Sequence, residues 1–292
     1  MSYKIAPVFL ITVAAMAQAQ DAVTLPGPGG LAIQAWHFRP AIGNMSAQPV
    51  VIALHGCGGL YATAGARKGQ LNARHQAMGE MLAQQGYHAL FPDSFGSRGI
   101  QGTCSEAQRL KNGIPMGMEE RRADTLATLA WVRVQPWADA QRNNIALLGW
   151  SNGAQTLLAA TDVGHRAVKA AGLPFKAAIA FYPGCVEANR TGYRPNAPLT
   201  LLLGADDDWT LPEPCIQLGE RLVKLGDAVT VKVYQSAVHG FDSPLPGIST
   251  YSDIPSRSPA RAGQGVQSGQ NPAAREDSWQ RVRGILKEAF AQ

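Results

Sequence analysis

Apolar residues gather along the chain in short continuous runs, separated by stretches of helical periodicity. The runs cover residues 50–54, 87–91, 144–150, 176–182, 199–204 and 229–234. A short run without polar alternation is typical of a strand buried on both faces of a parallel sheet. Residues 22–38 alternate instead, around the turn-rich GPGG, and predict an antiparallel hairpin ahead of the first run.

The segments between the runs carry apolar stripes at three- and four-residue spacing, which indicates helices packed on a sheet. The stripes are Ala77/Met78/Met81/Leu82, Leu126/Leu129/Ala130, Leu157/Leu158 and Trp279/Val282/Ile285/Leu286/Phe290. Regular alternation of strand and helix predicts a doubly wound, mostly parallel α/β sheet with helices on both faces. In such folds the ligand site lies at the carboxyl ends of the strands.

Composition divides the chain into a leader and one domain. Lys4 precedes the apolar IAPVFLITVAAMA, and Ala17-Gln18-Ala19 suits a signal peptidase, so residues 1–19 are predicted to be a secretory signal. The alternative is a short buried helix or membrane anchor, but the run is shorter than the ~20 residues that a spanning helix needs. Residues 20–292 then form a single domain without a separate cap, in the periplasm or secreted, with no membrane contact after cleavage.

One segment has neither helical nor strand periodicity. Residues 243–273 are rich in Ser, Pro and Gly, which predicts a long irregular loop. A loop of this length inside a compact domain is either functional or disordered.

The charge of the chain gives no sign of a nucleic-acid partner. The formal net charge is +5 and falls by one when Lys4 is cleaved off with the leader. The densest basic clusters are only Arg67/Lys68/Arg74 and Arg121/Arg122. A nucleic-acid-binding protein gathers such residues on one face, so we interpret these as a solvated surface.

The sequence GWSNG, residues 149–153, stands where an apolar run stops and a helical stripe begins. A serine becomes a useful nucleophile when its oxygen stands clear of the backbone and a base takes its proton. A sharp strand-to-helix turn gives that exposure and leaves room only for glycine on either side, which is the G-x-S-x-G nucleophile elbow. The alternative is an ordinary glycine-rich turn; the flanking strand and helix favour Ser151 as a nucleophile.

Such an elbow implies donors for the negative charge that develops on a substrate carbonyl. The backbone N–H of Asn152 would lie at a helix N-terminus, where the helix dipole favours an anion. The second donor is expected after an earlier strand, where the sequence reads HGCGG from residue 55. We assign it to the N–H of Cys57, with Gly58 as the alternative.

The general base and the carboxylate that orients it are expected in the loops that follow the later predicted strands. His239 directly follows the last predicted strand, whereas His75 lies on a predicted helix and His37 in the hairpin. The preceding strand ends in GADDDWT, so its carboxylates can reach that imidazole. Asp207 is the favoured acid and Asp208 the second choice, with Asp206 also competing.

The order Ser, Asp, His is that of α/β-hydrolases, and the chain resembles the dienelactone hydrolase family from about residue 24 to 290. The motifs that carry the resemblance are LHGCGG, PDSFGSRG, GWSNG, GADDDWT and YQSAVHGF, of which the last is the most specific. The resemblance implies a small, lidless α/β-hydrolase with serine or cysteine, aspartate and histidine in these roles.

The resemblance has two departures that concern substrate. The enzyme that names the family has a cysteine where this chain has Ser151, and a glutamate near the position of Gly56. It also binds a substrate carboxylate with arginines; Arg98 lies near one of these positions, and Ser243 stands at the other. Esterase chemistry therefore carries over, while dienelactone specificity does not. Arg98 is either an anion anchor or a salt-bridged surface residue.

Bulky residues and cysteines also gather at the predicted edge. Trp150, Trp209 and Phe241 line the site or pack beneath it. Four cysteines in an exported chain indicate disulfides. Cys185 and Cys215 are expected on neighbouring loops, so we predict a disulfide between them. The remaining pair is then Cys57 with Cys104.

These features together predict hydrolysis of a small carboxylic ester or lactone through an acyl-enzyme, without a metal or organic cofactor. A second reading is a serine peptidase of the oligopeptidase type, which usually carries a large propeller or cap that this chain has no room for. A third is an exported binding protein without turnover, which would be expected to lack one of the three catalytic residues.

Overall fold

The computed structural model describes residues 20–40, 48–112, 116–138, 143–172 and 175–291. The predicted signal segment, residues 1–19, lies outside this part of the chain. Within the described residues, no helix is both long enough and apolar enough to cross a membrane.

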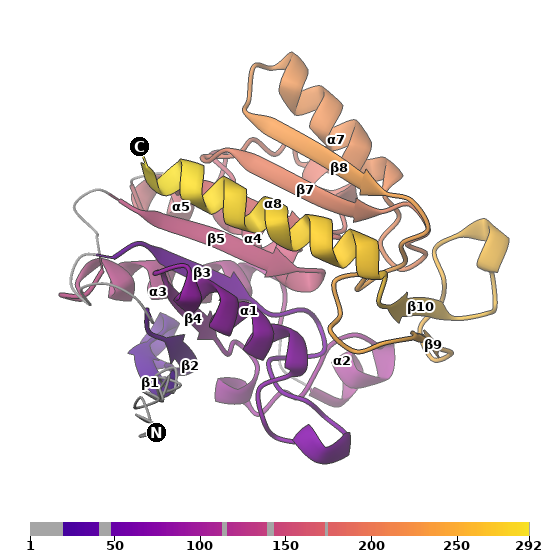
Figure 1. Cartoon of the computed structure of the whole chain (residues 1–292), viewed down its shortest axis with the longest axis horizontal. Coiled ribbons are helices and arrows are strands. Elements are labelled where there is room, and N and C mark those ends of the chain that lie inside the picture. Colours follow the sequence, from indigo (N-terminus) through magenta and orange to yellow (C-terminus); the bar gives the residue numbers. More distant parts are fainter. Residues whose placement is uncertain (1–19, 41–47, 113–115, 139–142, 173–174, 292) are drawn as a thin grey trace, which may run out of the picture.

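An eight-stranded sheet forms the centre of the molecule (Figure 1). Its order is β1-β2-β4-β3-β5-β6-β7-β8; β1 pairs with β2 and β2 with β4 in antiparallel fashion, and the other pairs are parallel. The strands are β1 (Gln20–Pro26), β2 (Ala32–Phe38), β3 (Val50–Leu54), β4 (His88–Pro92), β5 (Ile145–Trp150), β6 (Ala177–Phe181), β7 (Leu199–Gly204) and β8 (Val229–Tyr234). The predicted α/β fold is confirmed. The strand order reverses at β3, so β3 and β5 flank the switch point where ligands bind in such sheets.

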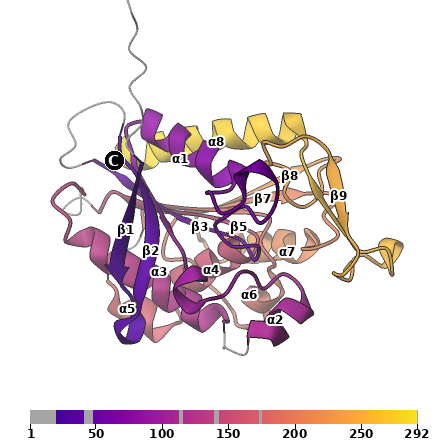
Figure 2. The same cartoon turned by 90° about the horizontal axis from the view of Figure 1, so that it is seen from below.

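Helices cover both faces of the sheet (Figure 2). One face carries α1 (Ala73–Gln84) and α8 (Pro272–Ala291). The other carries α3 (Met118–Arg133), α4 (Asn152–Thr161) and α7 (Glu213–Lys224), together with the short α5 (Arg166–Ala170) and α6 (Val186–Arg190). The remaining helix, α2 (Glu106–Asn112), lies beyond the carboxyl ends of the strands.

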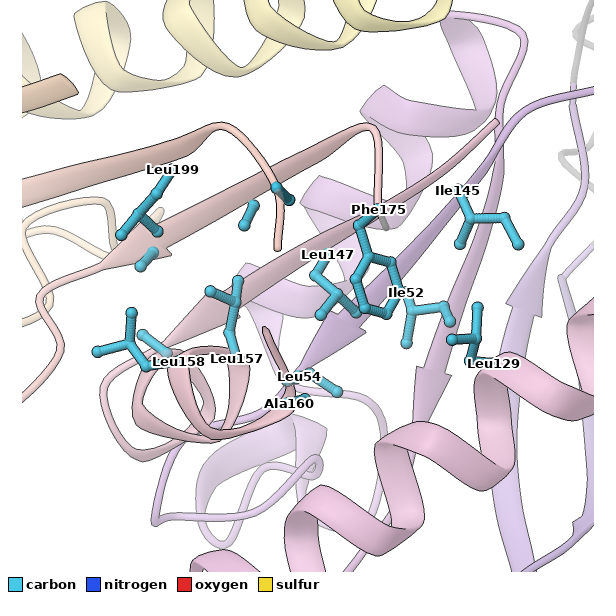
Figure 3. Packing of buried hydrophobic residues seen from close by; sticks show 14 of the residues in the cluster. Ile52, Leu54, Leu129, Ile145, Leu147, Leu157, Leu158, Ala160, Phe175 and Leu199 are labelled. Atoms are coloured by element: carbon cyan, nitrogen blue, oxygen red, sulfur yellow. The ribbon is translucent and has the colours of Figure 1, made fainter. Parts of the chain in front are cut away.

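Each face has its own apolar core. Figure 3 shows Leu129 of α3 and Leu157 of α4 facing Leu147 of β5 on one side of the sheet. On the other side Met78 of α1 and Val282 of α8 pack against the sheet. Burial on both faces explains why β3, β5, β6 and β7 read as uninterrupted apolar runs, whereas the edge strand β8 is only partly buried.

The segment 243–273 is not irregular throughout, contrary to the expectation. It contains an antiparallel pair, β9 (Ile248–Tyr251) with β10 (Val266–Gly269), at the edge of the molecule beyond the first turn of α8 (Figure 1). All of β9 is exposed. An exposed strand of this length needs no apolar alternation, and the pair therefore left no periodic signal in the sequence.

Two buried histidines make the fold sensitive to acid. Burial lowers the pKa of His75 from an ordinary 6.5 to about 3. The pKa of His37 is also lowered to about 3, mainly by burial and to a smaller extent by the neighbouring His88. Between these pH values the unfolded chain binds protons that the folded chain does not. Protonation of these two histidines therefore does not destabilise the fold above about pH 6.5, and the free energy of unfolding decreases as the pH falls from 6.5 toward 3.

We expect the free energy of unfolding to fall by about 1.4 kcal/mol per pH unit for each of these histidines below pH 6.5. Urea denaturation between pH 5 and 7.5 measures the slope. In the variant His75→Gln, whose amide can still reach the carbonyl of Leu60 that the ring contacts, one such contribution should vanish. An unchanged slope would contradict the assignment.

Candidate active site

The GWSNG sequence forms a strained strand-to-helix turn. Ser151 follows β5, begins α4 and has φ 53° and ψ −117°, which side-chain-bearing residues rarely adopt. A Cβ at Gly153 would collide with the carbonyl oxygen of Leu54, and one at Gly149 would lie 2.5 Å from the carbonyl oxygen of Gly153. Both glycines are therefore required by close backbone approach, and the serine oxygen stands free of the turn.

Three side chains from separate loops form a continuous hydrogen-bonded chain. The Nε2 atom of His239 lies 2.9 Å from the Oγ of Ser151, and its Nδ1 lies 2.8 Å from Oδ2 of Asp207. They follow the carboxyl ends of β5, β7 and β8. His239 is 5% exposed and Asp207 2%, so the contacts are screened from water. A base is thereby held between a hydroxyl and a carboxylate, the arrangement needed for a serine nucleophile.

Neighbouring donors fix the orientation of Asp207. Its Oδ1 accepts from the backbone N–H groups of Trp209 (2.9 Å) and Thr210 (2.8 Å), while Oδ2 accepts from the Thr210 hydroxyl (3.0 Å). The same hydroxyl oxygen lies 3.1 Å from Nδ1 of His239. Thr210 therefore touches both acid and base, a role that we did not predict although it stands in the GADDDWT motif.

The neighbouring Asp208 makes its contacts with a different part of the chain. Its carboxylate accepts from the Nε of Arg261 at 2.6 Å and from the backbone N–H of Gln267 at 2.9 Å. Its backbone oxygen accepts from the N–H of Arg257 at 2.8 Å. Asp208 thus ties the segment 243–273 to the acid turn, and the remaining competitor, Asp206, is exposed.

The HGCGG loop after β3 lies against the elbow. A Cβ at Gly56 would stand 3.3 Å from the carbonyl oxygen of Trp150 and 3.6 Å from the Cβ of Ser151. A disulfide joins Cys57 to Cys104, and the carbonyl oxygen of Cys57 accepts from the N–H of Thr103 at 2.8 Å. The loop that carries the expected second oxyanion donor is therefore covalently fixed beside the serine.

The model of the dienelactone hydrolase family matches residues 33–290, which is most of the chain. The chain belongs to the dienelactone hydrolase family. No curated protein was found to match it.

Solved structures share the fold of this dienelactone hydrolase family member at low identity. A Klebsiella pneumoniae protein assigned to the dienelactone hydrolases is 17% identical, with a TM-score of 0.70 over 93% of this chain and 99% of its own. The dienelactone hydrolase-like promiscuous phosphotriesterase P91 from metagenomic libraries is 20% identical, with a TM-score of 0.67 over 93% and 99%. An esterase from Thermogutta terrifontis is 16% identical, with a TM-score of 0.59 over 92% of each chain.

A buried arginine joins the two loops around Ser151 of this family member. The guanidinium of Arg121, on α3, donates from Nη1 to the side-chain oxygen of Asn152 (2.5 Å) and from Nη2 to the carbonyl oxygen of His55 (2.8 Å). Arg121 is fully buried, and burial lowers its pKa to about 10. Its Nε finds no partner among the described residues. Both of these hydrogen-bond acceptors are neutral, and the nearby carboxylates of Asp124 and Asp93 only partly offset the cost of burying the cation.

A second buried group anchors the histidine loop. Asp242 accepts from the indole N–H of Trp150 (2.8 Å) and the hydroxyl of Tyr182 (2.5 Å), and it forms an ion pair with the Nε of Arg74 (3.0 Å). Burial raises the pKa of Tyr182 well above its ordinary value, so the phenol stays protonated and donates. Asp242 follows His239 by three positions and thereby pins its loop to β5 and β6.

Two of the predicted substrate-binding residues are engaged elsewhere. Arg98 donates to both carboxylate oxygens of Asp124 at 2.8 Å and to the carbonyl of Ser94, so its guanidinium is committed within the protein. Trp150 is 1% exposed and packs beneath the site through its bond to Asp242. Phe241 is also fully buried.

Trp209, by contrast, lies beside His239. Its ring centroid is 4.8 Å from that of His239, and Tyr182 approaches the imidazole ring at 4.6 Å. The loops that carry these two aromatic residues are tied together nearby by the disulfide between Cys185 and Cys215. The four cysteines thus form the two disulfides expected from the sequence. Among the described residues, no cluster of histidine, cysteine, aspartate or glutamate could hold a metal ion.

Proposed function

We propose that this protein is a serine esterase that hydrolyses a small carboxylic ester or lactone through an acyl-enzyme. The observation that carries the proposal is the hydrogen-bonded chain from Ser151 through His239 to Asp207, with contacts of 2.9 and 2.8 Å. Membership of the dienelactone hydrolase family supports the same class of reaction.

The reaction follows from the position of each group. Ser151 Oγ attacks the ester carbonyl while His239 Nε2 takes its proton; Asp207 holds the imidazole and stabilises its charged form. The tetrahedral intermediate collapses as His239 gives the proton to the leaving alkoxide, and the acyl group stays on Ser151. Water, activated by the same imidazole, then attacks the acyl-enzyme and releases the acid.

The negative oxygen of the intermediate requires donors from two loops. We assign them to the backbone N–H groups of Asn152 and Cys57, with Gly58 as the alternative to Cys57. The position of Asn152 supports the first, because the N–H groups of a helix's first turn have no acceptor inside the helix. The contact of Gly56 with Ser151 supports a donor on the neighbouring loop.

Arg121 is assigned as the positioning residue that sets the distance between these donors. In Arg121→Met, His55 and Asn152 lose their shared partner, so we expect kcat to fall about 100-fold with KM changed less than about threefold. Arg121→Lys retains a cation and should recover part of kcat. Kinetics with 4-nitrophenyl acetate, alongside melting temperature, distinguish this from a loss of stability. A folded Arg121→Met with normal kcat would contradict the assignment.

Covalent labelling tests the function as a whole. A fluorophosphonate probe should label the wild-type protein at Ser151, and 4-nitrophenyl acetate should be turned over. Absence of both would favour the binding-protein alternative. Cleavage of peptide amides at rates comparable with esters would favour the oligopeptidase alternative.

We also propose that the protein is exported and that residues 1–19 are its signal. The two disulfides support an oxidising compartment, since such bonds persist there and are rare in a reducing cytosol. Mass spectrometry of the mature N-terminus after expression in a Gram-negative host should find it following Ala19.

A further inference from the structure

A cavity of about 750 Å³ opens beside the catalytic residues, on the α4 face of the sheet. It is bounded by α4, by α6 and by the turn that leads into α7. Pockets for small molecules commonly measure about 300–1,000 Å³, so this volume exceeds what the acetyl or methyl group of a minimal ester needs.

The near wall of the cavity belongs to the catalytic machinery. Trp209 and Thr210 line it. The Trp209 ring lies beside the His239 ring, and the Thr210 hydroxyl is within hydrogen-bond distance of the His239 Nδ1. Gln155, also in the lining, lies one helical turn beyond the nucleophile, with its N–H bonded to the Ser151 carbonyl. A molecule filling the cavity therefore lies within reach of an ester group held at the serine.

The apolar side chains of the lining suit a flat, bulky group. Trp209, beside the His239 ring, supplies an aromatic side chain, and Met118, Leu158 and Leu211 supply aliphatic surface. Aromatic rings gain stacking energy against such a wall beyond the area that they bury.

The charged residues of the lining are mostly paired with protein partners. Arg122 contacts Glu119 at 2.6 Å and His165 at 2.9 Å, and Glu187 pairs with Arg190. Arg122 also donates to the carbonyl of Ala159. Because the charges of Arg122 and Glu187 are paired and Arg257, also in the lining, is exposed to solvent, the cavity does not demand a charged ligand.

We infer that this cavity binds the non-reacting part of the substrate, and that this part is an uncharged aryl group or one of similar breadth. The inference rests on the proposed esterase function, since it places the ester itself at Ser151. It identifies esters that carry an aryl group on the acyl or alcohol chain, rather than short or linear aliphatic esters, as the preferred class.

Val186 offers a way to fill the cavity without disturbing the core. It lines the cavity at the first position of α6 and is 68% exposed. Val186→Trp should occupy the space, and Leu211→Trp blocks it from another wall. The matched control is Val223→Trp, because Val223 is also exposed, at 56%, but lies on α7 outside the cavity lining.

The substrates are 4-nitrophenyl acetate, hexanoate and 3-phenylpropanoate, with hexyl and 3-phenylpropyl acetates to examine the alcohol side. We expect wild-type kcat/KM to be highest for a phenylpropyl-containing ester in one of the two series. Either blocking variant should lower that value at least 10-fold, within the range for a mismatched pocket, and leave ethyl acetate, the reference ester without an aryl group, within about twofold. Val223→Trp should change neither.

Three results would overturn the inference: linear hexanoyl and hexyl compounds equal to the phenyl-bearing compounds, blocking variants without effect on the phenyl-bearing esters, or equal losses for ethyl acetate. A failure of the proposed function looks different, because wild-type protein would then neither turn over 4-nitrophenyl acetate nor react with the fluorophosphonate.

Discussion

Replacement of Ser151 by alanine is expected to lower kcat for 4-nitrophenyl acetate by at least about 10⁴-fold and to abolish fluorophosphonate labelling. In the proposed mechanism the oxygen of this hydroxyl forms the acyl-enzyme, and it lies 2.9 Å from the Nε2 of His239, the proposed base. Any residual hydrolysis would come from water held in the same site.

The variant should remain folded, because alanine, like serine, carries only a Cβ against the backbone and is strained to a similar degree by the positive φ at this position. Position 151 has φ 53° with either residue, and Ser151 makes no capping hydrogen bond with its side chain at the start of α4. Melting temperature therefore should stay close to that of wild type. Ser249→Ala, on the exposed β9, is the matched control and should keep full activity. Undiminished turnover in Ser151→Ala would exclude the proposed nucleophile.

The strands of the central sheet could be predicted from the sequence because burial left a simple signal. Every residue of β3, β5, β6 and β7 is buried, so each strand reads as an unbroken apolar run. The predicted runs 50–54, 199–204 and 229–234 coincide with β3, β7 and β8. The β9 and β10 pair has no such burial, and it escaped prediction for that reason.

The residues that surround the candidate site were harder to find than those at its centre. Ser151 and His239 stand in local motifs at strand ends, which the elbow geometry and the chain order explain. Arg121 contacts His55 across 66 positions, and Asp242 contacts Trp150 across 92. Such contacts depend on how helices and loops pack, and no local pattern in one sequence records them.

For Arg98 and Trp150 the sequence left two alternatives open, a contact with ligand or a position engaged within the protein. Both lie beside strand ends, which made them plausible ligand contacts, but position at the edge does not say which way a side chain turns. Asp124, buried on α3, draws the Arg98 guanidinium inward, and Asp242 does the same for the Trp150 indole. Each binds a buried carboxylate that sequence alone could not place.

Asp207 and Asp208 are neighbours in the sequence, and substituting each in turn distinguishes the proposed catalytic role of the first from the loop-anchoring role of the second. Asp207→Asn should lower kcat by about 10⁴-fold, because the amide no longer holds the imidazole in the required tautomer or stabilises its charged form. The Trp209 and Thr210 N–H groups can still bond to the amide oxygen, so the fold should persist. Steady-state kinetics on 4-nitrophenyl acetate, with melting temperature alongside, measure both effects.

Asp208→Asn is the matched control, since Asp208 is equally buried at 2% exposed and differs by one position. It weakens the contact with Arg261, which holds the segment 243–273, so melting temperature should fall while kcat stays within about tenfold of wild type. The two variants remove the same charge from the same turn. Only the direction of each carboxylate, toward His239 or toward Arg261, can separate their effects, and a larger loss of kcat in Asp208→Asn would reverse the assignment of the acid.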